Sequence, residues 1–318
     1  MSTPRTAGPS AEAQLLFLQR IQRLLQESDY TTTYKFALLK VLCDLSIELP
    51  DGEHTLHLDV IADRFIEIYW GQSRRFRGIE LSFGGSPRKP AKAITLAKQW
   101  RAACNDRFWK LQQSDRILVA RREMRQLIRR DVIWRLQPAQ GAPFIYRHGK
   151  DRDRIILVPG AVAAMRSLHT LLSDLIESHW TRWVQRRNPD ADTEESLREH
   201  LFGVDRRQLR RIVPDLLELQ EGRSFYSARR LDAKRVHVDH FIPWSLSRHD
   251  AIGNLVLCTP DENMRFSDSL KPASLRDTWS KRNLSLATEL EALARRTGLR
   301  WDPGATNAIA DWAYRAAG

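Results

Sequence analysis

The chain has 318 residues and a formal net charge of +12, because 51 Lys and Arg outweigh 39 Asp and Glu. This length allows a sizeable core in one large or two smaller domains, and the basic balance favours a polyanionic partner. Three widely spaced cysteines exclude a disulfide framework, and no apolar run is long enough for a signal peptide or a membrane span, so we expect a soluble, cytoplasmic protein without a membrane partner.

Helical periodicity dominates the first two thirds of the chain, after a short polar start at residues 1–10 that we expect to be disordered. Two apolar runs on either side of a charged turn, residues 143–146 and 155–158, predict a small hairpin among the helices. Pro214 is expected to break or kink the last of the helices in this part. We predict helices over residues 11–27, 34–49, 56–70, 91–112, 114–136, 161–187, 194–202 and 205–219.

Clusters of arginine residues lie on and between these predicted helices. Each cluster can be a solvated face or a surface that grips a nucleic-acid backbone, and the sequence leaves both interpretations open. Four arginines within residues 206–211 repel one another at i, i+4 spacing, a cost that a neighbouring polyanion would relieve. We therefore select these and the next cations along the chain as candidate nucleic-acid contacts: Arg206, Arg207, Arg210, Arg211, Arg229, Arg230, Lys234 and Arg235.

Residues 236–270 read as strand, loop, strand and helix. Polar and apolar residues alternate up to Pro243, which predicts a strand, and the apolar run 255–258 predicts a second. Thr259 followed by Pro260 and two acidic residues predicts the start of a helix. The segment is therefore expected to fold as a compact ββα unit.

Four polar residues in this unit have the chemistry of a one-metal nuclease. Asp239 and His240 are adjacent on a strand, so their side chains leave on opposite faces. Asp239 with Asn263 makes an all-oxygen set that suits Mg²⁺ or Mn²⁺, while His240 can take a proton from water. Asn254 can hydrogen-bond across the loop and fix the strand that bears His240. His237, on the same strand face as Asp239, is either an added metal or phosphate contact or an ordinary strand histidine. Trp244 and Arg265 are weaker candidates for a substrate groove, and all three join the candidate nucleic-acid contacts.

The pattern D-H-x-I-P-x-S, then N-L-V-L, then Asn263, resembles the HNH (ββα-metal) endonuclease motif over residues 222–270. Its offsets are similar to those of the HNH domain in RNA-guided CRISPR nucleases. The resemblance implies that Asp239 and Asn263 ligate the metal, that His240 is the general base and that Asn254 positions it. It also implies hydrolysis of DNA phosphodiester bonds, in bacterial restriction or anti-phage defence, with a partner protein supplying the choice of target.

Two departures from the motif stand beside these matches. Many HNH proteins bind a structural zinc through two C-x-x-C pairs, and the corresponding positions here carry Ser and Thr or Glu instead: Ser224, Ser227, Thr259 and Glu262. Cys258 alone cannot make such a site, so we expect no structural zinc. Phe266 stands where relatives often have Lys.

We therefore predict a mainly α protein with a small α+β part. The expected divisions are a disordered tail (1–10), a basic helical domain (11–219), an HNH ββα-metal nuclease domain (220–285) and C-terminal helices that pack on the core (286–318). The lost zinc positions leave a non-catalytic nucleic-acid-binding subunit as an alternative, and a ribonuclease or toxin is a third. Because HNH units often nick one strand, a double break would need a homodimer.

Overall fold

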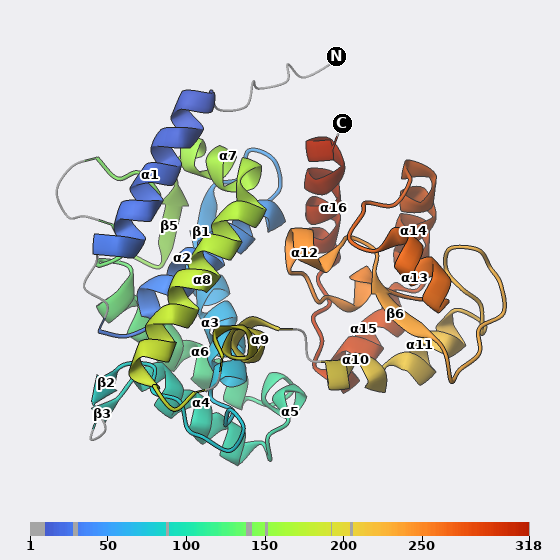
Figure 1. Ribbon diagram of the computed structural model, residues 1–318, viewed down its shortest axis with the longest axis horizontal. Coiled ribbons are helices and arrows are strands. Elements are labelled where there is room, and N and C mark those ends of the chain that lie inside the picture. Colours follow the sequence, from blue (N-terminus) through green and yellow to red (C-terminus); the bar gives the residue numbers. More distant parts are fainter. Residues whose placement is uncertain are drawn as a thin grey trace. The chain divides into compact units, whose positions relative to one another are not determined.

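The structure is a computed structural model, and it describes residues 10–27, 31–86, 89–137, 142–149, 152–191, 193–203 and 206–317. Helices dominate the described part, with small antiparallel sheets, so the predicted mainly α class is confirmed (Figure 1). The predicted disordered tail lies outside the described residues except for Ser10. Two compact units share the chain: Met1–Ala103 with Ile117–Phe202, and Cys104–Arg116 with Gly203–Gly318.

The first unit is built around a buried helix. The helix α2 is apolar on most of its circumference, so it is covered by α3, α7 and α8 rather than facing water. Phe36 on α2 stacks on Trp180 of α8, with ring centroids 5.9 Å apart. The helices of this unit are α1 (Ala11–Glu27), α2 (Tyr34–Glu48), α3 (Leu58–Gln72), α4 (Lys92–Ala103), α6 (Arg116–Leu127) with the π-helical turn η1 (Ile128–Val132), α7 (Pro159–Ser167), α8 (His169–Arg187) and α9 (Glu194–Phe202).

A three-stranded antiparallel sheet interrupts these helices, with the order β1 (Thr55–His57), β5 (Arg154–Leu157), β4 (Tyr146–His148). The predicted hairpin is present as β4 and β5, where His148 pairs with Ile155. The helix predicted from residue 56 was wrong at its start, because Leu56 pairs with Ile155 in the sheet. A second, two-residue ladder joins β2 (Gly85–Ser86) and β3 (Lys89–Pro90).

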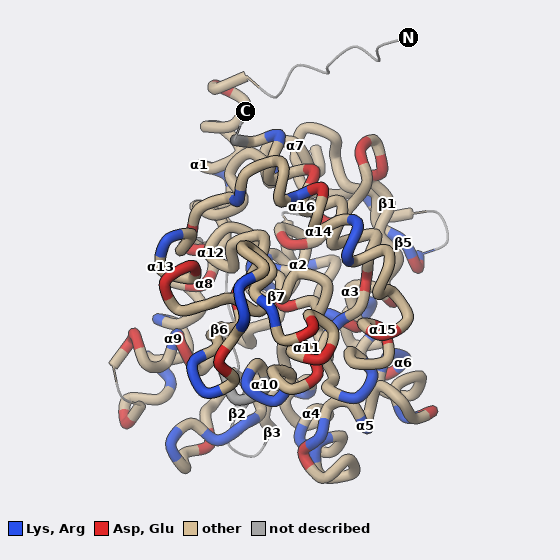
Figure 2. Tube along the Cα trace, turned by 90° about the vertical axis from the view of Figure 1, so that its right-hand side faces the viewer, with Lys and Arg blue, Asp and Glu red and all other residues tan. Residues whose placement is uncertain are grey.

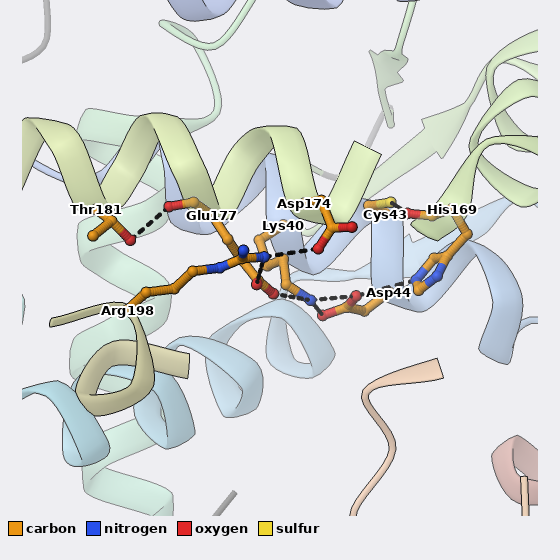
Figure 3. A network of polar contacts seen from close by, with 8 residues as sticks. All are labelled: Lys40, Cys43, Asp44, His169, Asp174, Glu177, Thr181 and Arg198. Carbon is orange, nitrogen blue, oxygen red and sulfur yellow. Dashed lines mark hydrogen bonds and ion pairs between the residues drawn. The ribbon is translucent and has the colours of Figure 1, made fainter. Parts of the chain in front are cut away.

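Ion pairs account for much of the charge in this unit. Figure 3 shows a network in which Lys40 of α2 lies 2.7 Å from Asp44 and 3.8 Å from Glu177 of α8, and Arg198 of α9 lies 3.0 Å from Glu177. The network ties three helices together and is partly buried.

The arginine face of α6 is also paired. Arg121 lies 2.7 Å from Asp63 and Arg125 lies 3.3 Å from Asp59, both acids of α3. These pairs favour the structural interpretation of that face over a phosphate-binding one.

The second unit consists of the ββα segment together with helices that precede it and helices that follow it in the sequence. Its core gathers apolar residues of α11, β7 and α15, among them Leu216, Leu257 and Leu293. Residues 205–219 are not one helix, because the chain breaks at Ile212 and Pro214 enters the first turn of the next helix. Its elements are α5 (Phe108–Gln112), α10 (Arg206–Arg211), α11 (Val213–Leu219), β6 (His237–His240), α12 (Trp244–Ser247), η2 (Ile252–Asn254), β7 (Leu255–Cys258), α13 (Pro260–Phe266), α14 (Ala273–Ser285), α15 (Ala287–Thr297) and α16 (Pro303–Ala317). No described helix is both long enough and apolar enough to cross a membrane.

Candidate active site

The site is built on the antiparallel pair β6 and β7, in which Asp239 faces Val256 and His240 faces Leu255. Alternation along β6 sends the side chains of Asp239 and His240 to opposite faces of the pair. The helix α13 follows β7 and contacts β6. Its start is fixed by a capping box, in which Thr259 Oγ1 accepts a hydrogen bond from the Glu262 amide at 3.2 Å and Glu262 Oε2 accepts one from the Thr259 amide at 2.9 Å.

His240 has a carboxylate partner. Its Nε2 lies 2.6 Å from Oδ1 of Asp250, which follows the short helix α12. His240 is mostly buried and Asp250 is partly exposed, so the pair lies at the surface of the unit. Asp250 was not selected from the sequence, because the turn of α12 that brings this residue back to β6 has no clear local signal.

Asp239 is buried and held by one hydrogen bond and one ion pair. The hydroxyl of Tyr226 donates to Oδ2 of Asp239 at 2.5 Å, and Nζ of Lys271 lies 3.3 Å from the same oxygen. Lys271 is fully buried and also donates to the carbonyl of His240 at 3.2 Å. Neither Tyr226 nor Lys271 was selected from the sequence, since both are distant from Asp239 along the chain.

Asn254 is completely buried and binds the chain that follows β6. Its Oδ1 accepts a hydrogen bond from the Ile242 amide at 2.7 Å, and its Nδ2 donates to the carbonyls of Ile242 at 2.9 Å and His249 at 3.1 Å. The side chain therefore bridges both ends of the loop between His240 and Asp250.

The helix α14 anchors the turn that carries Asn254. Trp279 and Asn283 donate to the carbonyl of Gly253 at 2.8 and 3.0 Å, and Arg282 donates to the carbonyl of Leu255 at 2.7 Å. Burial lowers the pKa of Arg282 to about 10. A Cβ at Gly253 would lie 3.2 Å from the ring of Trp301, so a side chain there would require that ring to shift by a few tenths of an ångström.

The four positions that correspond to zinc ligands in relatives form a hydrogen-bonded cluster. Glu262 Oε2 accepts from Ser224 Oγ at 2.6 Å and from Thr259 Oγ1 at 3.0 Å. Burial raises the pKa of Glu262, but hydrogen bonds from Ser224, Ser227 and Thr259 lower it by more, so the net pKa lies below its ordinary value. The described residues contain no group of three or more His, Cys, Asp or Glu arranged to hold a metal, and the lack of a structural zinc stays a prediction.

A divalent cation bound by oxygen atoms fits what Asp239 and Asn263 offer. Asn263 is half-buried on α13, the helix that contacts β6. Within the described part of the chain, Oδ1 of Asp239 and the side-chain amide of Asn263 have no hydrogen-bond partner. Carboxylate and amide oxygens without a partner are suitable ligands for Mg²⁺ or Mn²⁺.

The weaker groove candidates lie at the surface of the same unit. His237 is exposed on the strand face of Asp239, Trp244 is half-buried beneath the guanidinium of Arg248 at 4.2 Å, and Arg265 lies exposed over Phe266. In the part that the structure describes, none of His237, Trp244 and Arg265 makes a hydrogen bond or ion pair with Asp239 or His240.

Most of the selected cations are exposed and make no ion pair with another described residue. Figure 2 shows basic segments at α10 and beside β6. The side chains of Arg206 and Arg207 lie outside the described residues. Among described residues, six selected cations are exposed and make no ion pair: Arg210, Arg211, Arg229, Arg230, Lys234 and Arg235.

Comparison with known families and proteins adds one match. A family model described as HNH endonuclease matches residues 224–270, the stretch that runs from the serine cluster through β6, β7 and α13. Searches of curated proteins and of solved structures found no match to the chain. The protein therefore contains an HNH endonuclease domain at residues 224–270.

Proposed function

We propose that the protein is a metal-dependent endonuclease that hydrolyses phosphodiester bonds of DNA. The observation that carries this proposal is the arrangement on β6 within the HNH domain. Asp239 and His240 are adjacent and face opposite ways, and each has its own buried or half-buried partner. One residue can thus hold a cation while the other handles a proton.

The chemistry follows from the partners. A neutral imidazole that donates from Nε2 to Asp250 has an unprotonated Nδ1, which can accept a proton from water. The water oxygen forms a bond to phosphorus, the bond from phosphorus to the 3′ oxygen breaks, and the water proton goes to His240. Asn254 keeps the loop between His240 and Asp250 in place.

Asp239 and Asn263 would hold Mg²⁺ or Mn²⁺. When bound, the ion supplies positive charge for the phosphoryl oxygens and the leaving oxygen. The exposed cations that flank the domain would contact the phosphate backbone.

The resemblance to bacterial HNH proteins supports a role in restriction or anti-phage defence. A partner protein would supply the choice of target, and a homodimer would supply the second active site that a double-strand break needs.

A second candidate is a nucleic-acid-binding subunit without catalysis. The ion pair between Lys271 and Asp239 favours it, because a buried ammonium already balances the charge of the carboxylate that would bind the metal.

Plasmid cleavage with Mg²⁺, Mn²⁺ or EDTA separates the two candidates. We expect metal-dependent nicking or linearisation by the wild type, and its loss in His240→Ala and Asn263→Ala. A structured RNA substrate in parallel tests the ribonuclease alternative. A folded wild type that binds DNA and cleaves nothing under any metal would favour the binding subunit.

A further inference from the structure

We propose that Tyr226 is a positioning residue for the metal site: with Lys271 it holds Oδ2 of Asp239 and so presents Oδ1 to the divalent cation. This inference rests on the proposed metal site at Asp239 and Asn263.

The hydrogen bond and the ion pair act on one oxygen only. Tyr226 Oη donates a hydrogen bond to Oδ2 at 2.5 Å and Lys271 Nζ forms an ion pair with Oδ2 at 3.3 Å, while Oδ1 has no hydrogen-bond partner among the residues that the structure describes. A carboxylate held in this way cannot rotate about its last bond without losing both contacts. The oxygen that remains is therefore fixed in direction before any cation arrives.

Tyr226 is a permanent donor in this arrangement. Its hydroxyl donates a hydrogen bond to Oδ2 of Asp239 at 2.5 Å, because a carboxylate can only accept. A neutral phenol adds no charge to the site. Its effect on a metal is therefore one of orientation.

Tyr226 also links the two elements that carry the proposed ligands. Its hydroxyl binds Asp239 on β6, and its ring packs against Phe266 on α13, with ring centroids 4.5 Å apart. Phe266 lies three residues after Asn263 on that helix. One side chain thus sets both the orientation of the carboxylate and the approach of the helix that bears the amide.

Lys271 is the second side chain that holds Asp239 in place. Its ammonium lies 6.0 Å from the ring centroid of Tyr226 and 5.8 Å from that of Phe266, and it donates to the carbonyl of His240. The contact fixes the backbone at the residue that follows Asp239. Hydrogen bonds of this kind around liganding groups typically change metal affinity 10–100-fold when they are removed.

Mn²⁺ binding to the full-length protein, followed by calorimetry or by the spectrum of free Mn²⁺, tests the inference without any cleavage. Tyr226→Phe keeps the ring and removes the hydroxyl, and we expect its Mn²⁺ affinity to fall about tenfold. The matched control is Tyr146→Phe, which removes a hydroxyl that donates to the carbonyl of Ile133 at 2.6 Å in the first unit and should bind Mn²⁺ as the wild type does.

DNA affinity in EDTA, measured on the same variants, separates positioning from folding. We expect Tyr226→Phe to bind DNA like the wild type, since the exposed cations are untouched. Unchanged Mn²⁺ affinity in Tyr226→Phe overturns the inference and leaves the proposed function standing. A parallel loss of Mn²⁺ and DNA binding also overturns it, because the role would then be structural. Failure of the wild type to bind Mn²⁺ overturns the proposed metal site together with the inference.

Discussion

His240 and Asp250 form a hydrogen-bonded pair in which Nε2 of the imidazole lies 2.6 Å from Oδ1 of the carboxylate. A carboxylate only accepts, so Nε2 carries a hydrogen, and in the neutral imidazole Nδ1 is left as an acceptor. The pair fixes the ring and its tautomer at once. It makes Asp250 as important to the proposed chemistry as the histidine itself.

Asp250→Asn should therefore lower kcat about 100-fold or more, with little change in KM for DNA, because an amide can donate to the ring and stabilise the wrong tautomer. Single-turnover cleavage at saturating enzyme measures the effect. Asp277→Asn, at an exposed position of α14, is the control and should cleave like the wild type. Equal activity of the two variants would show that Asp250 has no part in the reaction.

Asn254→Ala should destabilise the second unit by about 2–4 kcal/mol, because it removes three hydrogen bonds and leaves buried polar groups of Ile242 and His249 without partners. Urea unfolding measures this change. Asn307→Ala, at an exposed position of α16, removes the same group where it makes no buried contact and should change stability by less than about 0.5 kcal/mol. A small effect at residue 254 would contradict a clamping role.

The loss of stability of the first unit at acid pH should depend in part on Asp44. Burial raises the pKa of this carboxyl, but the ammonium of Lys40 and the imidazole of His169 lower it by more, to about 2. The unfolded value is near 3.9, so the folded state favours the carboxylate. The resulting stability of about 2 kcal/mol is present above pH 4 and is lost as the pH falls from about 4 to 2.

Urea unfolding of the wild type and Asp44→Asn across this range checks the sign. The stability difference between them should narrow by about 2 kcal/mol between pH 5 and pH 2. Asp190→Asn, at an exposed position, should show no such narrowing. If the stability difference between the wild type and Asp44→Asn widened toward low pH, the pKa of Asp44 would not be lowered in the folded state.

Local patterns in the sequence were sufficient for the ββα unit. Alternation predicted β6, the apolar run predicted β7, and Thr259 with Pro260 predicted the start of α13. Each of these signals depends on residues only a few positions apart.

The partners of the site residues could not be predicted in this way. Tyr226, Asp250 and Lys271 reach Asp239 and His240 through the paths of loops, and loop paths depend on packing against α14 and α13 rather than on local preference. Helix breaks were missed for a related reason, since residues such as Asn105 adopt a left-handed backbone that ends α4 early without Gly or Pro to announce it.

The exposed cations before β6 should contribute to DNA affinity through phosphate contacts. Arg229→Gln with Arg230→Gln removes two charges that make no ion pair in the described part of the chain. Each lost phosphate contact should reduce the slope of log affinity against log salt concentration by about 0.9, so we expect a decrease of about 1.8 in the double variant.

The matched control is Arg295→Gln with Arg296→Gln, which changes net charge equally at two arginines paired with Glu291 and Asp215. Fluorescence anisotropy with a short duplex in EDTA, over a range of salt concentrations, compares them. If both variants lowered the slope equally, net charge rather than this surface would account for binding, and the assignment of the cations beside β6 would be wrong.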